Sequence, residues 1–387
     1  MSINGRPTAD NKLVSGFVPS THRKNPLLSL STSDTNEPIY DDIGSYPLPE
    51  GTSREWLKEA FAELSTSIST PTRREAKAEA LYNMIADAMW QKINAGVELP
   101  NYPQFQDMLS QFSDPIMDDK KVEAPLLIRE EEARIVELEA IEGLAAEYRA
   151  DKGERLGLRI CVTGPIELYY SQFQPPVYLD ILLNIAKSVG RFIKHSIEQA
   201  RNYEVRCVSI DEPSMGLDPR IEEEGVIKAL ETASLFAFQK GIDTQIHLHS
   251  PIFYELVCQV KGISVIGVES AANPALLNLI DKKQLENYDK FLRVGISRTD
   301  ILSMAAEYDE KHHTRAFSNR VILEAIIGEY NSPERVKRRL EHAYSIFDER
   351  IRYVGPDCGL KSFPSQELAF MVLKNTADGI RAFRAGN

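Results

Sequence analysis

The sequence predicts an α/β protein built as a (β/α)8 TIM barrel, because short apolar runs alternate with longer amphipathic segments along most of the chain. About eight such repeats over roughly 350 residues suit a barrel of eight parallel strands. Polar motifs also follow the ends of these runs, where a barrel places its chemistry. The alternative is an open doubly wound sheet, but no Gly-x-Gly-x-x-Gly follows a first apolar run.

The expected elements follow from these runs in order. Strands are expected at 39–43, 159–162, 205–210, 245–249, 265–268, 292–296 and 351–354, with a weaker one near 96–99. Helices are expected at 54–64, 73–95, 130–150, 177–200, 221–239, 318–327, 333–347 and 366–384. Residues 101–128 break the rhythm, so we expect an insertion over the barrel top.

The first 37 residues are rich in Ser, Thr, Asn and Pro and show little periodicity. This composition predicts an extended or partly disordered N-terminal arm, residues 1–37, ahead of a barrel domain over residues 38–387. The alternative is an arm that packs on the barrel or on a second subunit, as in a homodimer.

Composition excludes several classes of protein. The chain has 387 residues, 43% of them hydrophobic, which is enough for a sizeable core. A net charge of -12 argues against nucleic acid or an anionic membrane as a partner. No apolar run reaches the ~20 residues of a membrane span. The first residues lack an apolar signal core, and the four cysteines form no Cys-x-x-Cys pair, so a cytoplasmic location is expected.

A candidate metal site comes from three expected strand ends. His247 and His249 alternate on one strand and therefore face the same side. Glu269 follows the apolar run 265–268, and Cys358 lies in a rigid Gly-Pro-Asp-Cys-Gly turn. Imidazole, carboxylate and thiolate together favour zinc. For His249 alone, a role in acid–base chemistry or beside the ligands stays open.

Other strand ends offer groups that could hold a substrate. Asp211 ends the run 205–210 and could bind an ammonium group or act as a base. Ile43, Gly44 and Ser45 offer backbone N–H groups and a hydroxyl for a carboxylate. Arg298 could clamp an anion. The alternatives are ordinary strand-terminating turns and a solvated arginine.

Six stretches in order resemble the catalytic C-terminal barrel of the cobalamin-independent methionine synthase family. They are Ile43-Gly44-Ser45-Tyr46-Pro47, Thr163-Gly164-Pro165, Ile210-Asp211-Glu212-Pro213, His247-Leu248-His249, Val268-Glu269-Ser270 and Gly355-Pro356-Asp357-Cys358-Gly359-Leu360. The resemblance covers about residues 39–387 and is closest to the short, single-barrel branch. It implies a zinc enzyme that transfers a methyl group to homocysteine, with His247, Glu269 and Cys358 as ligands. It also implies that Ser45 and the backbone at Ile43 and Gly44 hold the substrate carboxylate, and that Asp211 holds its ammonium group.

Three departures from the family pattern bear on the methyl donor. His249 stands where the family has a cysteine, which makes the site more positive by about one unit. The acidic motif after the second strand is missing, and Asp107 is the only acid in its place. Arg298 stands near the place of the family's acidic histidine and cannot release a proton at neutral pH. A non-folate donor, such as a methylated corrinoid or its carrier protein, needs no such acid.

The sequence therefore predicts a zinc-dependent methyltransferase acting on a small thiol, with homocysteine as the expected acceptor and methionine as the product. One alternative is another thiol, such as coenzyme M, for which Arg298 could hold the sulfonate. A second is a non-catalytic zinc or partner-binding barrel. A third, a decarboxylase on the related uroporphyrinogen barrel, needs no metal and is disfavoured by Cys358 and Glu269.

Overall fold

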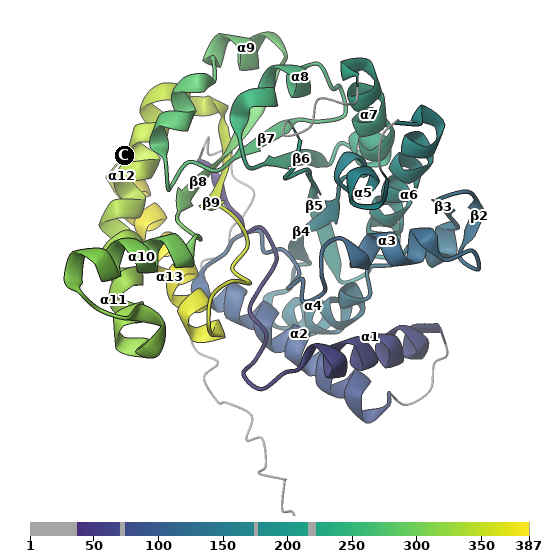
Figure 1. Cartoon of the computed structure of the whole chain (residues 1–387), viewed down its shortest axis with the longest axis horizontal. Helices are drawn as coiled ribbons and strands as arrows, with labels where there is room; N and C mark the ends of the chain where they lie inside the picture. Colours follow the sequence, from purple (N-terminus) through teal and green to yellow (C-terminus); the bar gives the residue numbers. More distant parts are fainter. Residues whose placement is uncertain (1–36, 70–73, 174–176, 216–221, 387) are drawn as a thin grey trace, which may run out of the picture. The chain divides into compact units, whose positions relative to one another are not determined.

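The computed structural model describes residues 37–69, 74–173, 177–215 and 222–386, which form one α/β unit (Figure 1). The predicted N-terminal arm lies outside the described residues except for Glu37. The division into arm and barrel therefore stays a prediction.

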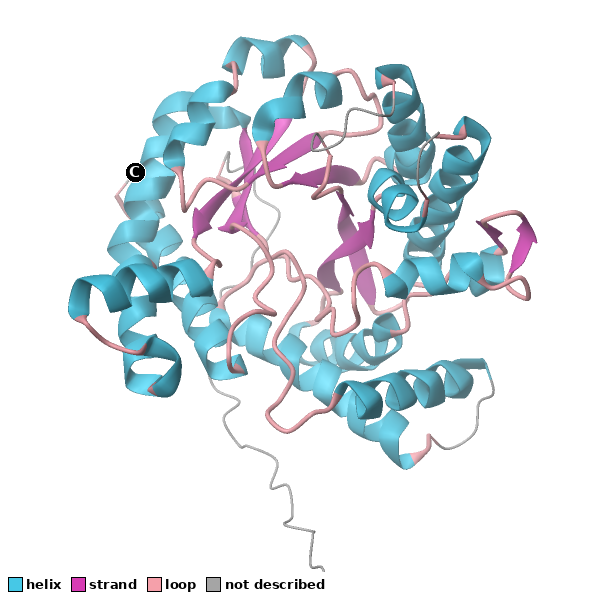
Figure 2. Ribbon diagram, viewed as in Figure 1, coloured by secondary structure: helices cyan, strands magenta, loops and turns pink. Residues whose placement is uncertain are grey.

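A curled parallel sheet forms the centre of the described unit (Figure 2). Its seven strands follow the order β1-β9-β8-β7-β6-β5-β4, and every neighbouring pair is parallel. The strands are β1 (Ile39–Tyr40), β4 (Leu156–Thr163), β5 (Tyr203–Asp211), β6 (Asp243–Leu248), β7 (Val265–Val268), β8 (Phe291–Ser297) and β9 (Ile351–Pro356). The seven strands expected besides the weak one near 96–99 are all present, and the prediction of a TIM-barrel-like fold is confirmed.

The segment 97–104 fills the gap between β1 and β4, the two ends of the sheet. The N–H groups of Glu98 and Leu99 each lie 3.0 Å from the carbonyl oxygen of Tyr40, and that of Arg159 lies 3.0 Å from the carbonyl oxygen of Pro100. Isolated parallel bridges join the same segment to both sides. Pro100 and Pro103 have no N–H to donate, so a regular ladder cannot extend through it. The segment near 96–99, where a weak strand is expected, thus occupies the position of the eighth strand of the barrel without forming a regular strand.

Helices surround the sheet, as the amphipathic pattern predicts (Figure 1). In α6, buried Leu182, Ile185, Val189 and Phe192 recur at helical spacing and face the core. α12 starts at a Ser332 cap whose hydroxyl accepts the N–H of Arg335, and Pro333 takes the first turn, where no N–H is needed. The helices that correspond to the expected ones are α1 (Arg54–Ser69), α2 (Ala76–Ala95), α4 (Glu137–Lys152), α6 (Leu179–Glu198), α7 (Glu223–Gln239), α11 (Arg320–Tyr330), α12 (Pro333–Phe347) and α13 (Gln366–Arg384).

Further helices lie in the loops between these elements. They are α3 (Ser110–Met117), α5 (Pro165–Gln172), α8 (Tyr254–Cys258), α9 (Lys282–Asn287) and α10 (Ile301–His312). The helix α5 was not expected from the sequence, although Pro165 at its first position is a helix-start signal. No helix among the described residues combines the length and the apolarity that crossing a bilayer requires.

The expected insertion at 101–128 is present but has structure of its own. It carries α3 and a hairpin of β2 (Val122–Ala124) and β3 (Leu127–Ile128). The hydroxyl of Ser188, on α6, accepts the N–H of Ile128 and donates to the carbonyl of Leu126. The hairpin therefore packs on a helix at the side of the barrel. Only the first part of the insertion lies at the strand ends, where Thr163 donates to the carbonyl of Met108.

Candidate metal centre

Three strands of the sheet, β6, β7 and β9, bring the four predicted ligands together, and β8 lies between β7 and β9. His247 lies near the end of β6, and His249 follows that strand. Glu269 comes directly after β7, and Cys358 comes two residues after β9. Because parallel strands all end at the same edge of the sheet, ligands far apart in sequence meet there.

The distances between the ligand atoms are close to or somewhat longer than those of a tetrahedral metal site. His247 Nε2 and His249 Nε2 lie 3.6 and 3.5 Å from Glu269 Oε1. Cys358 Sγ lies 3.7 Å from His247 Nε2 and 3.9 Å from His249 Nε2. Zinc bonds of about 2.0–2.3 Å at tetrahedral angles require ligand separations of ~3.3–3.6 Å. The four side chains are therefore spaced as a set that could hold one ion, with all ligand atoms within 4.8 Å of one another.

The electrostatics of the cluster also fit a cation. Glu269 Oε1 is buried and has no hydrogen-bond partner. Burial, and then the charge of Asp357, raises the pKa of Glu269 to about 7. Burial raises the pKa of the Cys358 thiol, and Glu269 raises it further. A divalent cation among these groups would compensate the buried charges and favour the thiolate.

The barrel interior next to the cluster is polar and holds two buried arginines. Arg293 Nε donates to Asp41 Oδ1 over 2.9 Å, and Arg159 Nε lies 3.4 Å from Asp41 Oδ2. Burial is the main cause that lowers the pKa of His247, followed by His249 and the two arginines. His247 therefore stays neutral, which is the state that binds a metal.

The predicted carboxylate-binding residues lie against the cysteine turn. The N–H of Leu360 donates to the carbonyl of Ser45 over 2.8 Å, and a Cβ on Gly359 would come within 1.8 Å of Ser45 Oγ. Only glycine at 359 leaves room for the Ser45 hydroxyl, which places that hydroxyl beside the metal ligands. The N–H of Gly44, in contrast, already donates to Asp42 Oδ2, so the Ser45 hydroxyl is the more available donor.

Asp211 is the register partner of His247 across β5 and β6, and it is 7% exposed. Its Oδ1 accepts a 2.6 Å hydrogen bond from the Ser209 hydroxyl. Burial raises the pKa of Asp211, and Arg159 opposes that shift. Glu212 points elsewhere, because its carboxylate accepts the N–H groups of Ile166 and Glu167 at the start of α5.

Arg298 does not have the free guanidinium that an anion clamp requires. Four of its hydrogen bonds go to the carboxylates of Asp300 and Glu307, at 2.7–3.1 Å. An arginine has five N–H donors, so almost all of them are used. We therefore correct its expected role: Arg298 holds the start of α10 together. Asp107 is exposed and caps α3 by accepting the N–H groups of Leu109 and Ser110.

Two buried groups that organise the site were not predicted from the sequence. Lys92, on α2, donates to Asp42 Oδ2, the carbonyl of Gly44 and the carbonyl of Asn101. A polar residue inside an apolar helix face was the available signal. Asp357 was named only as part of the cysteine turn, yet its carboxylate accepts three backbone N–H groups of the loop after Glu269.

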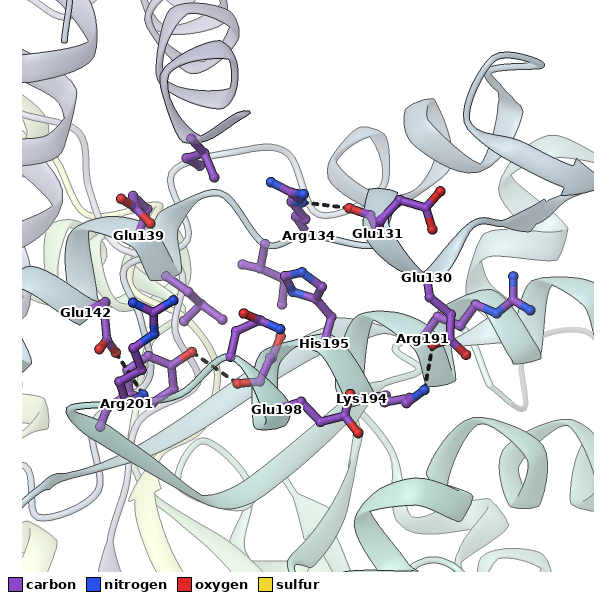
Figure 3. Close-up of a pocket in the computed structure, with 16 residues that line it drawn as sticks. Glu130, Glu131, Arg134, Glu139, Glu142, Arg191, Lys194, His195, Glu198 and Arg201 are labelled. Atoms are coloured by element: carbon purple, nitrogen blue, oxygen red, sulfur yellow. Dashed lines mark hydrogen bonds and ion pairs between the residues drawn. The ribbon is translucent and has the colours of Figure 1, made fainter. Parts of the chain in front are cut away.

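A cavity of about 720 Å³ lies elsewhere, along α4 and α6 (Figure 3). Its lining includes Arg134, His195 and Arg201 together with several glutamates. Lys194 pairs with Glu130 there. None of the predicted site residues lines this cavity, so it is separate from the metal cluster.

No family model matches the chain. The curated "Methionine synthase" of Sulfurisphaera tokodaii is 23% identical over 362 residues, which cover 88% of this chain and 91% of that protein. The chain is therefore similar to a methionine synthase over most of its length. The predicted resemblance is thereby confirmed. A solved B12-independent methionine synthase from Shewanella sp. W3-18-1, in complex with selenomethionine, superposes with a TM-score of 0.55 at 14% identity. The superposition covers 90% of this chain and 98% of the Shewanella protein, which shows that the two proteins share a fold.

Proposed function

We propose that this protein is a zinc-dependent methyltransferase that converts homocysteine to methionine. The observation that carries the proposal is the set of four ligand atoms, from His247, His249, Glu269 and Cys358, that meet at the ends of β6, β7 and β9. The similarity to a methionine synthase supports the reaction class.

The four side chains would hold Zn²⁺, which when bound favours the thiolate form of a substrate thiol at neutral pH. The remaining residues bind and orient the amino acid. Asp211, next to His247 across the sheet, accepts the substrate ammonium group. The Ser45 hydroxyl, beside the cysteine turn, donates to the substrate carboxylate. Fixing the ammonium and carboxylate groups on the α-carbon aligns the sulfur at the other end of the amino acid for attack on the methyl group.

The donor is the finer part of the proposal: a non-folate compound, with a methylated corrinoid as the candidate. Its support is that no acid stands ready at Arg298, whose guanidinium is bound by two carboxylates. Burial of the guanidinium is outweighed by those carboxylates, so Arg298 keeps its proton. A leaving group that needs protonation would find no donor at that position.

The test is a donor–acceptor matrix with zinc-loaded protein. Methylcobalamin and methyltetrahydrofolate are each combined with homocysteine, with coenzyme M, and with a homocysteine analogue that lacks the amine. We expect methionine to form from methylcobalamin and homocysteine, and we expect a higher KM for the analogue than for homocysteine. In Asp211→Asn, this difference in KM between homocysteine and the analogue should disappear. Methyl transfer from methyltetrahydrofolate but not from methylcobalamin would refute the proposed non-folate donor. Zinc-loaded protein that methylates none of the thiols would refute the proposed function.

A further inference from the structure

The carboxylate of Asp357 connects the two loops that carry metal ligands. Asp357 directly precedes Cys358, and it is 4% exposed. Its Oδ1 accepts the N–H groups of Ser270 and Ala271 over 2.9 and 2.8 Å, and its Oδ2 accepts that of Ala272 over 3.1 Å. These three N–H groups belong to the segment immediately after Glu269. The turn of one ligand is therefore tied to the loop of another.

The end of β8 provides the space and the frame for this contact. A Cβ on Gly295 would come within 1.9 Å of Asp357 Oδ1, so only glycine there admits the carboxylate. The Ser270 hydroxyl donates to the carbonyl of Gly295 over 2.8 Å, and the N–H of Asp357 donates to the carbonyl of Ser297 over 2.8 Å. Both loops are thus fixed to the same strand as well as to each other.

Hydrogen bonds from backbone N–H groups to an ionised carboxylate are short and about twice as strong as neutral ones. Three successive N–H groups that converge on one anion also fix the backbone of their loop. Without the carboxylate, the N–H groups of Ser270 and Ala271 would be buried and lack their acceptor. The loop that presents Glu269 would then lose its defined position relative to Cys358.

We propose that Asp357 is a positioning residue that holds Glu269 against Cys358 and thereby sets the metal affinity of the site. The inference deepens the proposed function and rests on its zinc site. Asp357 does not touch the metal or the substrate; it acts through the loop that carries Glu269.

Three variants and one control test this inference through zinc affinity, measured by competition with a chromogenic chelator. Asp357→Ala removes all three acceptor contacts. Gly295→Ala leaves the carboxylate in the chain but fills its space. Asp357→Asn keeps one oxygen for Ser270 and Ala271. Gly328→Ala is the matched control, because a Cβ on this exposed glycine of α11 meets nothing within 4 Å.

We expect the zinc dissociation constant to rise about 10- to 100-fold in Asp357→Ala and Gly295→Ala, the range for residues that orient ligands. Asp357→Asn should show a smaller rise in the zinc dissociation constant, and Gly328→Ala should bind zinc as tightly as the parent protein. In the Co²⁺-loaded protein, the visible spectrum should change in the first two variants. If Asp357→Ala does not fold, the other two variants carry the test. Folded variants with parental affinity and spectra would overturn the inference.

A double-mutant cycle with Glu269→Ala separates this role from general destabilisation. If Asp357 acts through Glu269, removing Asp357 should weaken zinc binding little further once Glu269 is gone. Full additivity would contradict the proposal. These measurements use metal alone, so they stand even if the loaded protein methylates no thiol. Failure of the methyl transfer and failure of this inference are therefore distinguishable.

Discussion

The two halves of the barrel fix their functional groups by different means. From β5 to β9, a continuous parallel ladder sets the strand register, and the metal ligands follow from it. From β1 through the segment 97–104 to β4, the ladder is interrupted and only isolated bridges remain. In this second half, buried polar side chains take over the role of the missing backbone bonds.

Lys92 is the central residue among the buried polar side chains that replace backbone hydrogen bonds in the interrupted half. Its ammonium group is fully buried and donates to Asp42 Oδ2 over 2.7 Å, to the carbonyl of Gly44 over 2.8 Å and to that of Asn101 over 3.0 Å. Asp42 Oδ1 accepts the N–H of Asn101 over 2.7 Å. One ammonium and one carboxylate thus join α2, the interrupted segment and the loop after β1 that carries Ser45. Metal binding should depend on the regular half, and stability and the binding of the substrate carboxylate at Ser45 should depend on the interrupted half.

The largest effect is expected in the regular half, from Cys358→Ala. Losing a thiolate ligand should weaken zinc binding by more than the ~100-fold that loss of an outer partner costs, so the purified variant should contain little zinc. Metal analysis of the protein checks this. Cys258→Ala, at a buried cysteine of α8, should retain full zinc. Full occupancy in Cys358→Ala would place the metal site elsewhere.

A smaller effect, of a different kind, is expected in the interrupted half from Lys92→Met. Removing one partner of a buried ion pair destabilises a protein by about 3–5 kcal/mol, because the other charge is left uncompensated. Urea denaturation should show this loss, and the KM for homocysteine should rise because the Ser45 loop is no longer held. Zinc affinity should stay at the parental value.

The double variant Lys92→Met with Asp42→Asn checks the cause of that effect. It removes both charges, so it should recover part of the lost stability. A loss of zinc affinity in Lys92→Met as large as its loss of stability would show that metal binding also depends on the interrupted half.

The same division decides what could be predicted from the sequence. In the regular half, apolar runs mark the strands, and His247, Glu269 and Cys358 come at or just after their ends, so their meeting point followed from topology. In the interrupted half, Pro100 and Pro103 erase the strand pattern. Contacts such as Lys92 with Asp42 join residues 50 positions apart through side chains, and no local pattern reports them. Arg298 shows a third limit of prediction from sequence. Asp300 and Glu307 lie near it in the chain, but the sequence does not show that their carboxylates bind its guanidinium.

The smallest effect concerns Glu137, which lies under the insertion next to the interrupted half. Its carboxylate is fully buried and accepts hydrogen bonds from the side-chain amides of Gln106 and Gln111. Burial raises the pKa of Glu137 to about 7, and these hydrogen bonds oppose the shift. The folded state therefore holds a proton that the unfolded chain releases near pH ~4.3. Stability should fall as pH rises through this window, because the folded state binds more protons than the unfolded state.

Glu137→Gln removes this titration while keeping the size of the side chain. In zinc-saturated protein, the free energy of unfolding of the variant relative to the parent should rise between about pH 5 and pH 7.5, by at most about 3 kcal/mol. Urea denaturation at several pH values measures the difference, in which titrations common to both proteins cancel. Zinc affinity should be unchanged at every pH, since Glu137 lies in α4, outside the regular half that carries the metal ligands. Parallel stability curves would show that Glu137 does not release its proton in this range, and a coupled change in zinc affinity would show that the two halves are not independent.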